Sequence, residues 1–126
     1  MKTERKKLRR LADTQATVEN LARSRVADAV SQLNTCERQL ERAKLALSAP
    51  FVSLVFSDLH IRHVQRLIEK CGDRRNALIG AHSNLQDEVV RGQKLNERLQ
   101  KAKASAVREE EDNAILERLD WLALHR

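Results

Sequence analysis

Pro50 is the only proline in the chain, and it separates two long segments that contain few residues able to interrupt a helix. Residues 1–47 contain neither glycine nor proline, and only three glycines occur in the whole sequence. Proline disfavours a continuing helix because it lacks an N–H and its ring clashes with the preceding turn, and it biases Ala49 away from the α conformation. One helix is therefore expected before Pro50 and another after it.

The two expected helices have approximate bounds in the sequence. The first should span about residues 2–48, and a connector should span about 49–57. Side-chain oxygens of Ser57 and Asp58 can cap the free amides of a new first turn, so the second helix is expected over about 58–124. Aromatic residues make up 2% of the chain and charged residues 33%, so the large side chains of a compact core are missing. We therefore predict one all-α domain over residues 1–126, a two-helix antiparallel coiled-coil hairpin.

Apolar residues spaced alternately three and four apart form a candidate seam on each helix. The first series is Leu8, Leu11, Gln15, Val18, Ala22, Val26, Ala29, Leu33, Cys36, Leu40, Ala43 and Leu47. The second series is Ile61, Val64, Ile68, Cys71, Arg75, Leu78, His82, Leu85, Val89, Gly92, Asn96 and Leu99. Folding the chain back near Pro50 pairs them so that Cys36 faces Cys71. Two successive spacings of four around Ala22 predict a stutter, and the register there is left open.

In this register the last twenty residues, Val107–Arg126, extend past the start of the first helix. They carry an apolar stripe formed by Ile115, Leu119 and Leu122 at i, i+4 and i+7. We interpret this segment as a partner-binding surface, with the single Trp as an anchor. The alternative is that the segment folds back or pairs with another copy of the chain. The residues expected to contact the partner are Ile115, Leu116, Leu119, Trp121 and Leu122.

The first ten residues carry a concentrated positive charge within a chain whose net charge is +6. Basic side chains there imply an acidic partner, and no aromatic residue is interleaved with them to stack on nucleic-acid bases. An acidic protein surface is thus favoured over nucleic acid, and a solubilising helix end is the alternative. The acidic run Glu109–Asp112 should lie nearby. The candidate binding residues are Arg5, Lys6, Arg9 and Arg10.

The connector carries both phenylalanines of the chain. Its apolar side chains either cap the open end of the hairpin or contact a partner. The longest apolar run, Phe51–Phe56, is far shorter than the ~20 residues that span a bilayer, so we expect no direct membrane span. The N-terminal sequence lacks the apolar region of a secretory signal, and a cytoplasmic protein is expected. The candidate tip residues are Phe51, Val52, Leu54 and Phe56.

The sequence offers no pattern that would build an enzyme. It has no glycine-rich phosphate loop or nucleophile motif, and a two-helix rod has no enclosed cavity to desolvate catalytic groups. His60, His63 and Asp58 do not make a convincing set of metal ligands, and Cys36 and Cys71 are interpreted as small core residues. We therefore expect no catalysis, no metal, no cofactor and no small-molecule substrate.

The basic start KKLRRLADTQ, the small-residue seam of the first helix and the ending ILERLDWLALHR together resemble the central-stalk proteins of bacterial type III secretion. These are the FliJ family of flagella and the YscO/HrpO-like family of injectisomes. The resemblance implies a partner hexameric secretion ATPase, an export-gate membrane protein and export chaperones. It also implies that both termini meet the ATPase and that the Phe51–Phe56 end lies toward the gate. A nucleic-acid-associated coiled coil and a self-assembling coiled coil are the alternatives.

Overall fold

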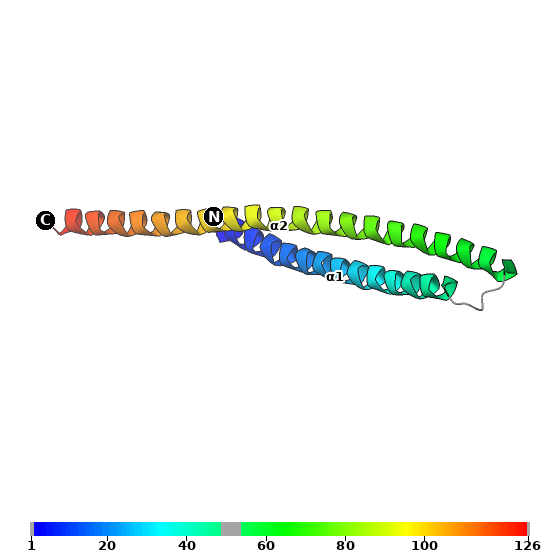
Figure 1. The fold of residues 1–126 in the computed structure, drawn as a ribbon. Coiled ribbons are helices and arrows are strands. Elements are labelled where there is room, and N and C mark those ends of the chain that lie inside the picture. Colours follow the sequence, from blue (N-terminus) through cyan, green and yellow to red (C-terminus); the bar gives the residue numbers. More distant parts are fainter. Residues whose placement is uncertain (1, 49–53, 126) are drawn as a thin grey trace. The chain divides into compact units, whose positions relative to one another are not determined.

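The computed structural model describes residues 2–48 and 54–125. They form two helices, α1 (Lys2–Leu47) and α2 (Leu54–Leu124), and the described part of the chain contains no strand. The predicted all-α two-helix hairpin is confirmed, and Figure 1 shows both helices. Phe51 and Val52 of the expected tip lie outside the described residues, as do the side chains of Leu54 and Phe56.

The first helix ends at Leu47, shortly before Pro50, as the sequence predicted. The Ser48 amide donates to the Leu45 carbonyl at 3.1 Å, and the Ser48 hydroxyl donates to the Lys44 carbonyl at 3.2 Å. These bonds satisfy carbonyls that the helix end would otherwise leave free. The second helix begins at Leu54, four residues earlier than expected, so Ser57 lies inside its first turn instead of capping it. A cap is worth only ~1 kcal/mol, and nothing in Leu54–Phe56 forbids helix once Pro50 has been passed.

The chain divides into two compact units, which are described separately. The connector unit comprises Glu19–Glu88, and the terminal unit comprises Met1–Val18 together with Val89–Arg126. Each unit pairs a stretch of α1 with a stretch of α2 that runs in the opposite direction.

The core of the connector unit is a thin layer of small and aliphatic side chains between its two helices. Ala43 and Leu47 pack against this cluster. The Cys36 and Cys71 sulfurs lie 3.0 Å apart, which confirms the predicted pairing of these two positions. The buried members of the cluster are Cys36, Leu40, Val64, Leu67 and Cys71.

Every second residue of the seam predicted for α2 is buried or partly buried in the structure. Val64, Cys71, Leu78, Leu85, Gly92 and Leu99 are buried or partly buried, as expected. Of the positions between them, Val89 is partly buried as expected. The others are wrong, because Ile61 and Ile68 are 45% and 50% exposed and Arg75, His82 and Asn96 are exposed. From Val64, Cys71 and the other members of that first set, the next seam residue in the structure lies three residues farther along α2, whereas the prediction placed it four residues farther along. This choice buries Leu67 and partly buries Arg74, Ala81 and Leu95. Arg75, His82 and Asn96 stay exposed.

The seam of α1 follows the prediction from Ala22 to Leu47 and departs from it nearer the N-terminus. Leu11 is 53% exposed and Val18 is 37% exposed, whereas Ala12 and Glu19 are partly buried. Spacings of three and four therefore alternate without interruption along the described helix, and the expected stutter is absent. An unbroken heptad pattern keeps one face of the helix on its partner throughout, which is the condition for knobs-into-holes packing.

The new seam places a carboxylate inside the connector unit. Glu88 is only 7% exposed, where the prediction had Val89 in the seam. Its side chain has an interaction partner, so the carboxylate is not left unsatisfied. A buried polar group with a partner costs less than an orphaned one, and polar seam positions in coiled coils fix register.

Candidate partner-binding site

The C-terminal part of α2 presents apolar side chains to solvent. Every described side chain from Val107 to His125 is exposed. Ile115, Leu119 and Leu122 are each 55–56% exposed, and Leu116 is 57% exposed. Exposed apolar surface of this extent on one short segment is typical of an interaction surface. We call residues 107–125 the tail.

The end of the tail is ordered by contacts within its last turn. The His125 amide donates to the Trp121 carbonyl at 3.2 Å, and His125 Nδ1 lies 2.9 Å from the same oxygen. The two rings stack, with centroids 4.4 Å apart and planes inclined by 19°. This contact holds the indole, which is itself 59% exposed, against the helix. The only Trp of the chain is thus presented in a restrained orientation.

The apolar stripe and Trp121 lie on different sides of the tail. At about 100° per residue, Ile115, Leu119 and Leu122 fall within an arc of about 60°. Trp121 lies about 120° around the helix from Ile115, and Leu124, which is 83% exposed, points in a third direction. The residues expected to contact the partner thus lie on more than one face of the tail. The final turn is therefore apolar around most of its circumference.

The stripe is not an extension of the seam that pairs α2 with α1 in the terminal unit. That seam runs through Leu95, Leu99, Ala102 and Ala106. Its heptad positions continue as Glu109, Asn113, Leu116, Asp120 and Ala123, of which three are polar. The stripe residues Ile115, Leu119 and Leu122 each stand one residue before one of these positions. A shift of one residue turns a side chain by about 100°, so a partner of the stripe approaches from a different direction than α1 does.

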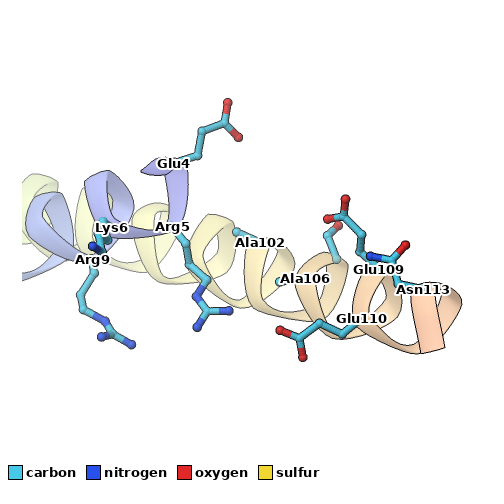
Figure 2. Close-up of a pocket in the computed structure, with 10 residues that line it drawn as sticks. Glu4, Arg5, Lys6, Arg9, Ala102, Ala106, Glu109, Glu110 and Asn113 are labelled. Carbon is cyan, nitrogen blue, oxygen red and sulfur yellow. The ribbon is translucent and has the colours of Figure 1, made fainter. Parts of the chain in front are cut away.

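The basic residues of α1 lie beside the acidic run of α2, within the terminal unit. Arg5, Lys6 and Arg9 line a groove of about 520 Å³ together with Glu109 and Glu110. In the view of Figure 2, Arg5 and Arg9 extend to the same side as Glu110, whereas Glu4 points the other way. Arg10, the fourth residue of the predicted basic set, is exposed and does not line the groove. The floor is formed by the small side chains of Ala102, Ser105 and Ala106.

The charges around this groove are available to a partner. In the described part of the chain, none of Arg5, Arg9 or Glu109 forms an ion pair. Exposed charges interact weakly within one molecule because water and salt screen them. Their arrangement, with cations from α1 and carboxylates from α2, can still orient an incoming surface.

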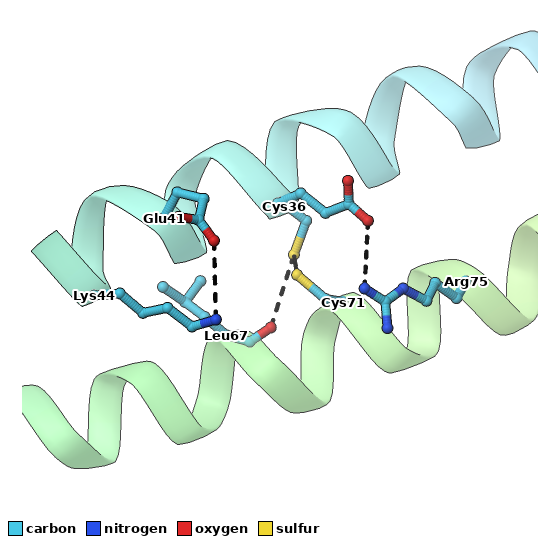
Figure 3. A network of polar contacts seen from close by, with 7 residues as sticks. Cys36, Glu41, Lys44, Leu67, Cys71 and Arg75 are labelled. Carbon is cyan, nitrogen blue, oxygen red and sulfur yellow. Dashed lines mark hydrogen bonds and ion pairs between the residues drawn. The ribbon is translucent and has the colours of Figure 1, made fainter.

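The thiol pair of the connector unit forms a second local cluster, shown in Figure 3. The Cys71 thiol donates to Cys36 Sγ at 3.0 Å, and Cys36 Sγ lies 3.9 Å from the Leu67 carbonyl oxygen. Burial, followed by the hydrogen bond to Cys36, raises the pKa of Cys71 to about 11. The thiol is therefore protonated near neutral pH and is a weak nucleophile there. One helical turn away, Arg75 pairs with Glu37 at 3.4 Å.

One set of charged residues was missed by the sequence prediction. Arg42, Lys70 and Arg74 lie along one groove of the connector unit, together with His60 and His63. His60 and His63 were considered only as metal ligands, and in the described residues no group of three or more His, Cys, Asp or Glu side chains gathers as a metal site would require. Spacings of three, four and seven residues along α2 were the available signal, because they place these side chains on one side of the helix.

Comparison with protein-family models, with curated proteins and with solved structures gives no match for this chain. Within the described residues, neither α1 nor α2 contains a stretch long and apolar enough to cross a membrane.

Proposed function

We propose that this chain binds another protein through its tail and performs no catalysis itself. The observation that carries the proposal is the exposure of Ile115, Leu119 and Leu122 on a continuous helix, with Trp121 held on a second side. Burying one such side chain contributes about 1.5–3 kcal/mol, so a few of them suffice for a specific complex. The unpaired charges of Arg5, Arg9 and Glu109 would orient the partner.

The partner we propose is the hexameric ATPase of a type III secretion system, of the flagellar or the injectisome kind. A final turn that is apolar around most of its circumference is suited to an environment that surrounds the end of the helix. The central opening of a ring provides such an environment, whereas a flat groove covers only one side. The resemblance to the FliJ and YscO/HrpO-like stalk proteins supports the same partner. The protein would act in the cytoplasm, reaching the inner face of the membrane through its partners.

The resemblance further supports two contacts away from the ATPase. Residues near the connector, including Leu54 and Phe56, would meet the export-gate membrane protein. Export chaperones would bind along the helices. In this role the protein would couple the ring to the gate.

The experiment that tests the tail compares two substitutions that each add one negative charge. Leu119→Asp removes an apolar side chain and should weaken binding to the purified ATPase at least tenfold, with a matching loss of stimulated ATP hydrolysis. Ala104→Asp adds the same charge at an exposed position that lies outside both the stripe and the groove lined by Arg5 and Arg9, and it should stay near wild type. Circular dichroism should show unchanged helicity in both, because both positions are exposed. Unchanged stimulation by Leu119→Asp would overturn the proposal.

Nucleic acid is a poorer partner for the tail on charge grounds. Residues 107–126 contain three arginines against six carboxylates, a net charge of −3 with His neutral. Binding to nucleic acid requires cations along the contact, and the affinity falls steeply as salt rises. A steep salt dependence of binding to DNA or RNA would support that alternative.

A further inference from the structure

The connector unit carries a groove whose charge is of one sign. Two adjoining hollows, of about 540 and 170 Å³, lie between α1 and α2 and share Gln39 and Lys70 as lining residues. Together we call them the basic groove. The charged or titratable side chains that line it are Arg42, His60, His63, Lys70 and Arg74.

No acidic side chain lines the basic groove. Arg74 donates from Nη1 to the amide oxygen of Gln32 at 2.7 Å, which fixes its position without neutralising it. In the described part of the chain, neither Arg42 nor Lys70 forms an ion pair. Elsewhere in the unit, by contrast, Arg75 is paired with Glu37. Concentrated charge of one sign in a groove attracts a segment of the opposite sign.

The floor of the basic groove is apolar and shallow-sided. Ala43 and Ala46 are small, and Leu67, which is 7% exposed, closes the bottom between the helices. Small side chains leave room for the larger aliphatic side chains of another helix to insert between them. The groove follows α1 from residue 31 to residue 46, a length of about 22 Å at 1.5 Å per residue. Its occupant should be a helix that is apolar on one side and acidic at the flanks.

The tail of this same chain has those properties. Its stripe runs from Ile115 to Leu122. On a helical projection Glu111 and Asp112 fall on either side of it, and Arg118 is the one cation of this segment at its edge. From Glu111 to Leu122 the segment is about 17 Å long, which fits within the groove. The tail contains two arginines against six carboxylates, a net charge of −4 with His neutral, so two tails repel each other, whereas a tail and a basic groove attract.

We propose that the tail of a second copy of this chain lies in the basic groove, with its stripe on Ala43, Ala46 and Leu67 and its carboxylates beside Lys70 and Arg42. Such a contact joins two different surfaces, so copies either close on each other or extend into larger assemblies. The contact also covers the stripe. If the tail binds the ATPase as proposed above, self-association withholds it until the ATPase competes.

The test measures the solution mass of the full chain as a function of concentration, by analytical ultracentrifugation at about 50 mM salt. Wild type should associate, and raising the salt to about 500 mM should weaken the association at least tenfold because the Debye length shortens to a few ångströms. Lys70→Glu should also weaken it at least tenfold. The matched control is Arg62→Glu, which reverses an exposed charge about 80° around α2 from Lys70 and outside the groove, and it should leave the association unchanged.

A charge exchange makes the test specific for this pair of surfaces. A chain with Glu111→Lys and Asp112→Lys should fail to associate with itself, as should Lys70→Glu. Mixing the two variants brings a basic tail to an acidic groove and should recover association between unlike chains. Circular dichroism on each variant confirms that the helices are intact.

Three results would overturn the inference. They are a wild-type chain that stays monomeric at every concentration, an association that Lys70→Glu leaves unchanged, and a mixture that fails to recover association. Different variants test this inference and the proposed function, so one can be wrong while the other holds. Lys70→Glu keeps the tail and should stimulate the ATPase fully, whereas Leu119→Asp should lose both contacts.

Discussion

Joining Cys36 to Cys71 by a disulfide should stabilise the connector unit by about 4 kcal/mol. The sulfurs lie 3.0 Å apart and the residues are separated by 35 positions. A bond length of about 2.05 Å requires the sulfurs to approach by roughly 1 Å. Closing a loop of this size removes about 13 cal/mol/K of entropy from the unfolded chain, which corresponds to about 4 kcal/mol at 25 °C.

The assay uses a mild thiol oxidant such as diamide, which accepts the two hydrogens that the thiols lose. Mass spectrometry should show the loss of two hydrogens from a single chain, and a non-reducing gel should show a faster monomer. Urea unfolding, followed by helicity, should move its midpoint upward by about 2 M for an m value of about 2 kcal/mol/M. The Cys36→Ser chain treated in the same way is the control and should not shift.

Because Cys71 has its pKa raised from 9.0 to about 11, the reaction should quicken as pH rises through that range. In the reduced chain the folded unit holds this proton more tightly than the unfolded chain does. The resulting stabilisation is complete below about pH 9 and is lost as pH rises toward 11. Crosslinks found exclusively between chains, or a crosslink within the chain that leaves the midpoint unmoved, would refute the pairing of these helices.

Two further substitutions test the packing of α2. Leu67→Ala should cost about 2–3 kcal/mol in urea unfolding because the side chain is 7% exposed, whereas Ile68→Ala, at 50% exposed, should cost less than about 1 kcal/mol. If Ile68→Ala cost more stability than Leu67→Ala, the seam predicted from the sequence, with Ile68 buried, would be correct. Gly80→Ala should stabilise the helix by about 0.5–1 kcal/mol, since nothing lies within 4 Å of the added methyl group, and a loss of stability would mean that the face is packed.

The sequence was sufficient to predict the helices and one of their contacts. Pro50 divides the chain so strongly that two helices were the only reasonable expectation, and spacing alone placed Cys36 opposite Cys71. The other half of the α2 seam was ambiguous, because Leu67 and Ile68 are adjacent and both apolar. Steps of three and of four share every second position. Each choice also puts charged or titratable side chains in the seam, Arg75 and His82 in one and Arg74 and Glu88 in the other, so the pattern alone does not choose between them.

The candidate surfaces were predictable to different degrees. The tail stripe is local to one helix, so the i, i+4, i+7 spacing of Ile115, Leu119 and Leu122 was enough to find it. The basic groove arises only when α1 and α2 are paired, because Arg42 comes from one helix and Lys70 from the other. Each helix taken alone is a mixture of both charges. The absence of acids from the groove is therefore a property of the pairing and is not visible in either segment.

The one-residue offset between the stripe and the seam makes the tail sensitive to insertions and deletions. Adding or removing one residue between Ala106 and Ile115 would turn the whole stripe by about 100° while moving it only 1.5 Å along the axis. Composition, charge and helicity would hardly change. An insertion of seven residues would bring the stripe back to within about 20° of its original direction, although about 10 Å farther out. Related chains are thus expected to differ in this stretch by whole heptads.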